Sequence, residues 1–404
     1  MKILQVNCVY NTGSTGKIMY DIHTEILKTG YESVVCYGRG ANAQDKNVYK
    51  ICSEIYSKFN NLLSRFTGIM YGGCFFSTNK LISVIKKENP DVVHLHCING
   101  YFVNIYRLIN WLKKNRIKTV LTLHAEFMHT ANCGYAFDCE KWKSGCGNCP
   151  VFKKETKSLF FDSTARSFKK MKKAFDGFNE NLVIASVSEW LMERAKQSPI
   201  LAGKKHITVL NGLDNGVFNP CFSEALAKQI GTSDKKTVLF VTPAFSLDPN
   251  HIKGGYYVVE LARRMPDVNF VIIGCREQYD NLPKNVLNIG RIENQSKLAE
   301  YYSTADVTLL ASKRETFSMV TAESLSCGTP VVGFKAGAPE TITIPEYSCF
   351  VEYGDIDALR KTVNEFLLKQ FDREEIATEA SQKYDKKIMS QNYITVYKKL
   401  VNLL

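Results

Sequence analysis

Short apolar segments alternate with helical patterns along almost the whole chain, and this alternation constrains the fold most. The predicted strands of the first half are Ile3–Val9, Glu32–Tyr37, Asp91–His96, Lys118–His124 and Val183–Val187. Those of the second half are Thr237–Thr242, Asn269–Gly274, Val286–Ile289, Val307–Ala311 and Pro330–Phe334. Strands that alternate with helices build parallel sheets from βαβ units. We therefore predict an α/β fold.

The length of the chain and its two series of strands indicate two domains. A chain of 404 residues is too long for one compact core. We predict two similar Rossmann-like, doubly wound domains that face a central cleft, spanning residues 1–205 and 206–385.

The composition indicates a cytoplasmic globular protein. Hydrophobic residues make up 45% of the chain and charged residues 23%, which is ordinary for such proteins. No apolar stretch approaches the length that crosses a bilayer. The N-terminus begins directly with a strand pattern and lacks the apolar region of a secretory signal.

The formal net charge of +12 calls for an anionic partner. Basic residues concentrate in Arg166–Lys173 and at Lys153 and Lys154. A basic helix that contains an aromatic residue can lie on an anionic membrane, and a solvated helix face is the alternative. No nucleic-acid recognition motif accompanies these segments, so we predict no nucleic-acid partner.

Two acidic residues eight positions apart, Glu315 and Glu323, mark the candidate site of the second half. Ser318 is a natural N-cap for a helix that begins at about Met319. This layout places Glu315 at the carboxyl end of a strand, where open α/β sheets bind ligands. Glu323 follows about one turn into the helix, near the same crevice.

The start of this helix is a predicted anion site. Helix N-termini present unpaired amide groups, here those around Phe317, Ser318 and Met319. Two carboxylates that flank a phosphate cradle suit a sugar nucleotide, which carries hydroxyls at both ends and a diphosphate in the middle. The alternative is that both glutamates are ordinary surface carboxylates.

Several motifs together resemble retaining glycosyltransferases of family 4. They are the two glutamates with the following Gly337–Glu340, Val209–Asp214 leading to Phe218–Pro220, Lys253-Gly254 at a helix start, Asp91–His96 and Thr122–His124. The match spans essentially the whole chain. The resemblance implies a GT-B fold, with the acceptor bound mainly by the first domain and the nucleotide sugar mainly by the second. It also implies that a C-terminal helix over residues 386–404 crosses back to the first domain.

The resemblance also implies roles for individual residues. Glu323 would bind the ribose hydroxyls of the nucleotide, and Glu315 the hydroxyls of the transferred sugar. Lys253 would neutralise the diphosphate, because a leaving group that gains negative charge needs a fixed cation. His124 would face the donor sugar, and the glycine loop after the first strand would approach the donor near Gly16.

The chain departs from the family pattern at two points. The family places an arginine on the loop that corresponds to residues 241–248, but this loop has no basic residue. Arg291 is the distant candidate to replace that cation. His124 is followed by Ala125 where the family often has an aspartate. The nearby His94 and His96 alternate along an apolar strand, and we assign them no chemical role.

Four of the thirteen cysteines fall in the segment 133–150. Cytosolic cysteines packed in this way bind metal more often than they form disulfides. Four thiolates suit structural zinc, with iron as an alternative, and leave no open position for catalysis. Reduced thiols or a redox pair would also account for the cluster. The predicted ligands are Cys133, Cys139, Cys146 and Cys149.

The resemblance implies a retaining transfer of a sugar from a UDP- or GDP-sugar to a lipid-linked or oligosaccharide acceptor, in surface polysaccharide synthesis. No Asp-x-Asp motif stands out, so we predict that catalysis needs no metal cofactor. The protein would contact the inner face of the plasma membrane peripherally. Two further functions remain open: a nucleotide-sugar epimerase of the same fold, and a non-catalytic protein that binds nucleotide sugars.

Overall fold

The computed structural model describes residues 1–232, 234–277 and 279–402, which form two compact units. Unit 1 comprises Met1–Leu210 and Met389–Leu404, and unit 2 comprises Asn211–Ile388. Among the described residues, no helix combines the length and the apolar character that crossing a membrane requires.

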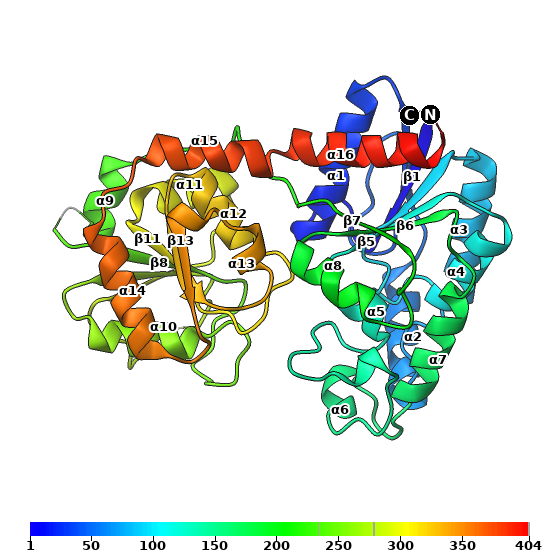
Figure 1. Cartoon of the computed structure of the whole chain (residues 1–404), viewed down its shortest axis with the longest axis horizontal. Helices are drawn as coiled ribbons and strands as arrows, with labels where there is room; N and C mark the ends of the chain where they lie inside the picture. The colour runs from blue at the N-terminus through cyan, green and yellow to red at the C-terminus, as the bar shows by residue number, and fades with distance from the viewer. Residues whose placement is uncertain (233, 278, 403–404) are drawn as a thin grey trace. The chain divides into compact units, whose positions relative to one another are not determined.

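Unit 1 is built on a seven-stranded parallel sheet with the strand order β3-β2-β1-β4-β5-β6-β7 (Figure 1). Its strands are β1 (Lys2–Asn7), β2 (Glu32–Tyr37), β3 (Val48–Lys50), β4 (Val92–Leu95), β5 (Thr119–Leu123), β6 (Leu182–Ser186) and β7 (Lys205–Thr208). Its helices are α1 (Gly13–Lys28), α2 (Glu54–Thr67), α3 (Phe75–Glu88), α4 (Ile105–Lys114), α5 (Phe127–Thr130), α6 (Phe152–Glu155), α7 (Thr164–Phe175), α8 (Glu189–Lys196) and most of α16 (Lys386–Leu400).

Unit 2 is built on a six-stranded parallel sheet with the order β10-β9-β8-β11-β12-β13. Its strands are β8 (Thr237–Val241), β9 (Asn269–Ile273), β10 (Val286–Gly290), β11 (Val307–Leu310), β12 (Val331–Phe334) and β13 (Ser348–Val351). Its helices are α9 (Glu224–Ile230), α10 (Gly255–Arg264), α11 (Gln295–Thr304), α12 (Met319–Ser326), α13 (Pro339–Ile342), α14 (Ile356–Leu368) and α15 (Arg373–Tyr384).

Both sheets reverse their strand order at one point, which places the candidate sites. In unit 1 the reversal lies between β1 and β4, where Ile3 pairs with Val92. In unit 2 it lies between β8 and β11, where Thr308 pairs with Leu239. Open α/β sheets bind ligands beyond the carboxyl ends of the strands at such a reversal. The predicted α/β class with two doubly wound sheets is confirmed.

Every predicted strand is present, but β3, β7 and β13 were not predicted. All three are edge strands of their sheets. None of the residues of β3 is fully buried, and β7 and β13 are only partly buried. An edge strand covered on fewer sides needs no continuous apolar run, so the pattern that marks central strands is absent from it.

The C-terminal helix α16 completes the core of unit 1. Its residues Met389, Tyr393 and Tyr397 pack with the α1 side chains Ile18 and Ile22. The two tyrosines are fully buried and bind strand residues: the Tyr393 hydroxyl lies 2.9 Å from Thr122 Oγ1, and the Tyr397 hydroxyl lies 2.6 Å from His94 Nδ1. Residues from 389 onward are therefore part of the first unit.

The basic segment Arg166–Lys173 lacks the exposed apolar face of a helix that lies on a membrane. It forms the central part of α7, whose buried side chains include Phe168 and Met171, and α7 packs on α4. The only aromatic residue in the segment is therefore covered. Its lysines form a solvated helix face, which was the alternative interpretation of this segment.

Candidate functional site

Two loops lie against each other where the second sheet reverses its strand order. The Lys313 amide, after β11, donates a hydrogen bond of 2.8 Å to the Ile252 carbonyl, before α10. Gly254 has a φ of 69°, and a Cβ at this position would lie 2.0 Å from the carbonyl oxygen of Ala311. Glycine alone tolerates both the positive φ and the close approach. Gly254 therefore holds the residue before it beside the end of β11.

This contact brings Lys253 and Glu315 together. Lys253 Nζ lies 2.6 Å from Glu315 Oε1, and the two side chains are 21% and 13% exposed. The backbone of Glu315 is held on both sides, because its amide donates to the Ala336 carbonyl at 2.9 Å and its carbonyl accepts from the Ala338 amide at 3.2 Å. The cation and the carboxylate predicted for the donor thus form one partly accessible pair.

The helix after Glu315 begins at Met319 with Ser318 as its N-cap, as predicted. Ser318 Oγ accepts a hydrogen bond of 3.2 Å from the Thr321 amide. Ser318 has a φ of 85°, a conformation that a residue with a side chain rarely adopts and that strains the backbone. Phe317 and Ser318 are buried, and the Phe317 ring packs edge-on against Tyr384. Only backbone groups at this helix start are suited to an anion.

Glu323 lies within the first two turns of α12 and is half-buried. Its Oε2 accepts a hydrogen bond of 3.0 Å from the hydroxyl of Tyr302, which is fully buried. Burial and the neighbouring Glu323 carboxylate raise the pKa of Tyr302 well above its usual value, so the phenol stays protonated and donates. The Tyr302 hydroxyl thereby orients one carboxylate oxygen of Glu323, the residue predicted to bind the ribose.

Arg291 does not join the Lys253–Glu315 pair. It follows the edge strand β10, which two strands separate from β11, and its Nε lies 3.4 Å from Glu293 Oε1. A nearer cation in the chain is Arg314, half-buried and adjacent to Glu315 in the same loop. The family pattern did not suggest Arg314, because the pattern places its arginine after the strand that corresponds to β8.

Beside Arg291, the carboxyl ends of β9 and β10 border an open cavity of about 470 Å³. No sequence pattern indicated this cavity, because its lining comes from the loop after β9 and from strand β10, which are brought together only in the folded sheet. The residues that line it include Cys275, Arg276, Glu277, Tyr279, Asn288 and Gly290.

In unit 1, the half-buried His124 lies beside the buried imidazoles of His94 and His96. His124 Nε2 is 3.3 Å from His96 Nδ1, and the two rings are stacked with centroids 5.6 Å apart. His96 Nε2 in turn lies 3.1 Å from Gln5 Oε1, and the His94 ring centroid lies 3.9 Å from that of His96. These side chains come from β1, from β4 and the residue after it, and from the end of β5.

Burial lowers the pKa of His124 to about 4 and the pKa values of His94 and His96 well below their usual value. All three rings are therefore neutral at pH 7. A neutral His124 can donate or accept a hydrogen bond at the strand end, but it adds no positive charge there.

Gly16 lies in the first turn of α1, not in a loop, because this helix already begins at Gly13. A Cβ at Gly16 would lie 3.1 Å from Val9 Cγ2 and 3.3 Å from the Val9 carbonyl oxygen. The Gly16 carbonyl also accepts a hydrogen bond of 3.1 Å from the Asn11 amide. In this structure Gly16 therefore allows the loop after β1 to pack on the helix.

The four cysteines of the segment 133–150 line one small cavity of about 20 Å³. All four are free thiols. Burial raises the pKa of Cys133 and Cys149, and that of Cys146 to about 11, so these thiols are protonated when no metal is bound. Within the described part of the chain, no three histidine, cysteine, aspartate or glutamate side chains are arranged to hold a metal ion. The donor chemistry fits zinc, but this arrangement of the side chains does not.

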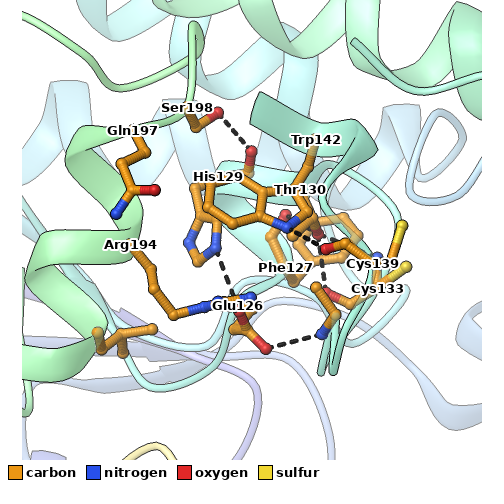
Figure 2. Close-up of polar contacts among 12 residues, drawn as sticks. Glu126, Phe127, His129, Thr130, Cys133, Cys139, Trp142, Arg194, Gln197 and Ser198 are labelled. Carbon is orange, nitrogen blue, oxygen red and sulfur yellow. Dashed lines mark hydrogen bonds and ion pairs between the residues drawn. The ribbon is translucent and has the colours of Figure 1, made fainter. Parts of the chain in front are cut away.

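A buried charge cluster anchors the cysteine-rich segment to unit 1 (Figure 2). Glu126 is fully buried and accepts from Arg194 Nε at 2.6 Å and from the Ala136 amide at 2.7 Å. Its Oε1 lies 3.5 Å from His129 Nε2. Burial acts to raise the pKa of Glu126, but the contacts with His129, Arg194 and the Ala136 amide outweigh it and lower that pKa. Glu126 is therefore ionised at neutral pH.

Trp142 contacts both the buried charge cluster around Glu126 and the cysteine-rich segment. Its indole N–H donates to the Cys139 carbonyl at 2.7 Å, and the Arg194 guanidinium lies 4.9 Å from its ring centroid. Figure 2 shows Trp142 packed between the Arg194 side and the cysteine side of the cluster. No sequence signal linked these residues, because Arg194 lies far from Glu126 along the chain.

Comparison with known proteins relates unit 2 to one family. Residues 223–383 match the family model described as "Glycosyl transferases group 1". The putative colanic acid biosynthesis glycosyl transferase WcaC of Escherichia coli is 27% identical over 164 residues, 37% of this chain and 40% of that protein. The N-acetyl-alpha-D-glucosaminyl L-malate synthase of Bacillus anthracis is 23% identical over 335 residues, 79% of this chain and 77% of that protein.

The fold has solved counterparts. The Anabaena protein Alr3699/HepE, solved in complex with UDP-glucose, superposes with a TM-score of 0.63 at 15% sequence identity, over 99% of this chain and all of that chain. At this identity the likeness establishes the fold alone. The predicted GT-B fold is confirmed.

Proposed function

We propose that this chain, whose residues 223–383 form a group 1 glycosyltransferase domain, is a retaining transferase that moves a sugar from a UDP- or GDP-sugar to an acceptor hydroxyl. The observation that carries the proposal is the Lys253–Glu315 pair, partly accessible at the strand-order reversal of unit 2 and followed directly by the N-terminus of α12. The cation and the helix N-terminus suit the diphosphate of an activated sugar, and the carboxylate suits its sugar hydroxyls.

In the proposed reaction, the chain's residues position the donor and stabilise the departing diphosphate. Lys253 and the backbone amides at the start of α12 would stabilise the negative charge that develops on the leaving group. Glu315 would exchange its contact with Lys253 for the sugar hydroxyls. Glu323 would bind the ribose, and the cavity at the ends of β9 and β10 would accept the base. The acceptor hydroxyl would attack the anomeric carbon from the face that the leaving group vacates, without a protein nucleophile. The bond to the diphosphate would break, and the hydroxyl proton would pass to an oxygen of the departing diphosphate.

His124 is proposed to contact the transferred sugar. Its neutral ring supplies a hydrogen bond instead of a charge, and His96 and Gln5 behind it hold the ring in place. This role does not require the imidazole to become protonated, consistent with its lowered pKa.

The acceptor is proposed to be a lipid-linked or oligosaccharide glycan in surface polysaccharide synthesis. WcaC, whose name assigns it to colanic acid biosynthesis, supports this class of pathway. The net charge of +12 supports peripheral contact with the anionic inner face of a membrane.

Structural zinc in the cysteine-rich segment remains a prediction that rests on the four thiols alone. Bound zinc would require the four sulfur atoms to close on a common centre as thiolates. Elemental analysis of protein purified anaerobically is expected to find about one zinc per chain, and Cys133→Ser should remove it. Metal-free protein of full stability would contradict the prediction.

The test of the proposed function is release of the nucleoside diphosphate from a panel of UDP- and GDP-sugars, with and without acceptor glycans. Glu315→Gln should reduce turnover at least about 100-fold, the scale of one lost transition-state contact. Glu365→Gln, an exposed carboxylate on α14, is the matched control and should leave turnover unchanged.

Product analysis separates the transferase from the two further functions. An epimerised donor without acceptor would replace the transferase assignment with an epimerase. Nucleotide binding without any turnover, unaltered by Glu315→Gln, would leave a non-catalytic binding protein.

A further inference from the structure

Helix α2 of unit 1 buries polar side chains and exposes apolar ones, the reverse of an ordinary surface helix. Its buried residues are Ser57, Asn60 and Ser64, all small or polar. Its exposed face carries five large apolar side chains, among them Ile55 at 83% exposed and Phe59 at 60%. A surface helix of a globular protein normally buries its apolar stripe and exposes its polar one. The remaining three apolar residues are Leu62, Leu63 and Phe66.

Hydrogen bonds of the buried face fix this orientation. Asn60 Oδ1 accepts from the Cys74 amide at 2.6 Å, and a Cβ on Gly73 would lie 2.2 Å from the same oxygen. Ser57 Oγ donates to the Gly100 carbonyl at 3.3 Å. A rotation that buried the apolar face would leave these buried polar groups without partners. The outward apolar face is thus part of the fold.

Two neighbouring segments extend the apolar face. At the start of α3, Phe75 and Phe76 are exposed, and the Phe76 ring lies 5.9 Å from Tyr56 of α2. At the other end of α2, the exposed Phe160 ring lies 5.9 Å from Phe66. The Leu159 amide donates to the Arg65 carbonyl at 2.8 Å. We call the exposed apolar side chains of α2, Phe75–Phe76 and Leu159–Phe161 the α2 surface.

The charges around the α2 surface are mostly positive. Lys58 and Arg65 are exposed on α2, and further exposed lysines precede Phe160 in the chain. The acidic Glu54 is bound to Arg39 and to the Gly40 amide. Asp162 accepts hydrogen bonds from two backbone amides. The further lysines are Lys153, Lys154 and Lys157.

We propose that the α2 surface inserts into the interface of an anionic phospholipid bilayer, with Phe, Leu and Ile side chains among the acyl chains and the flanking cations at the lipid phosphates. An exposed apolar face bordered by lysine and arginine is the pattern of interfacial helices. A second copy of this chain is the less suitable occupant, because pairing two such surfaces would bring their cations together. Insertion into the bilayer is argued from the α2 surface alone. That this insertion would bring the protein to a lipid-linked acceptor rests on the proposed function.

The test is co-sedimentation with vesicles of phosphatidylcholine alone and with added phosphatidylglycerol. The wild-type chain should bind the anionic vesicles, and the triple variant F59S/L62S/F66S should bind them at least about 10-fold more weakly. These side chains are exposed, so the fold should persist, and thermal unfolding checks this. The double variant F222S/L368S removes exposed apolar side chains of unit 2 and should bind like the wild type.

A second pair of variants tests the charges. K58E/R65E should weaken binding to the anionic vesicles and leave any binding to neutral vesicles unchanged. The proposal would be overturned if the wild-type protein did not bind anionic vesicles, or if the triple variant bound them as well as the wild type. So would concentration-dependent self-association of the wild type that the triple variant abolishes, because a second copy would then cover the surface.

Donor hydrolysis in detergent-free buffer separates this proposal from the proposed function. The triple variant should hydrolyse a nucleotide sugar as the wild type does. Loss of vesicle binding with intact hydrolysis supports the docking surface, whereas intact vesicle binding without turnover of any donor contradicts only the proposed enzymatic function.

Discussion

Two acid–base pairs near the carboxyl ends of strands, one from each unit, differ in what surrounds them. In the Glu126–Arg194 pair of unit 1, the carboxylate is enclosed: Glu126 is fully buried and has three polar partners. Glu315 and Lys253 in unit 2 have each other and remain partly exposed. The sequence motifs pointed to the second pair and gave no sign of the first.

The difference teaches how to separate a structural ion pair from a candidate binding site. A buried carboxylate whose oxygens are all engaged has no capacity left for a ligand, and removing its partner leaves a charge that water cannot reach. A partly accessible pair can exchange its internal contact for a ligand at small cost. Position at a strand end is common to both pairs and does not distinguish them.

The largest expected effect is on stability. Arg194→Ala leaves the fully buried Glu126 without its counter-charge, so we expect a loss of about 3–5 kcal/mol in the free energy of unfolding. Lys253→Ala removes a half-buried pair and should cost about 0–1 kcal/mol. Chemical denaturation of both variants measures the contrast, and equal losses would remove the distinction drawn between the pairs.

The next effect is on catalysis. Lys253→Met should lower turnover of the donor about 10²–10³-fold, because the departing diphosphate loses a fixed cation. Lys236, which pairs with Asp306 at 2.9 Å before β8 and β11, is a matched control at the opposite ends of the same two strands. Lys236→Met should retain turnover, and comparable losses in both variants would point to a general charge effect.

A smaller effect is expected on nucleotide binding. Glu323→Gln can still accept a hydrogen bond from Tyr302 but loses its charge, and it should weaken binding of the free nucleotide by about 1–3 kcal/mol. Tyr302→Phe should change binding less, since the carboxylate remains. Titration calorimetry gives both values, and unaltered affinity in Glu323→Gln would remove the proposed ribose contact.

The smallest effect per residue concerns pH and should arise in unit 1. His94, His96 and His124 have folded-state pKa values below that of an unfolded histidine. Below about pH 6.5 the unfolded chain therefore binds more protons at these residues, and stability falls. We expect a loss of about 1.4 kcal/mol for each of these three histidines between about pH 7.5 and pH 5.5.

Denaturation at the two pH values, with His124→Asn as the comparison, measures this loss. The variant should show a flatter dependence on pH than the wild type. An unchanged slope would show that His124 titrates normally in the folded protein.

Much of the fold was predictable because central parallel strands are buried on both faces and appear as apolar runs. The Ser318 cap and the helix start at Met319 were predictable for a local reason: serine hydroxyls accept from nearby amides. The predicted glycine loop near Gly16 is instead the first turn of α1, because the glycines at the N-terminus of this helix resemble a loop in composition. The sequence does not reveal that Arg291 follows an edge strand, two strands away from β11, so it could not separate Arg291 from the Lys253–Glu315 pair.

The sequence by itself determined the alternation of strands and helices, and with it the fold class and the loops that could carry a site. Only the tertiary structure decided which of those residues meet: Lys253 with Glu315 through the Gly254 contact, and Glu126 with Arg194 in the interior. It also decided that α2 turns its apolar side outward. Local patterns depend on neighbours along the chain, whereas burial and pairing depend on residues that come together only when the sheets form.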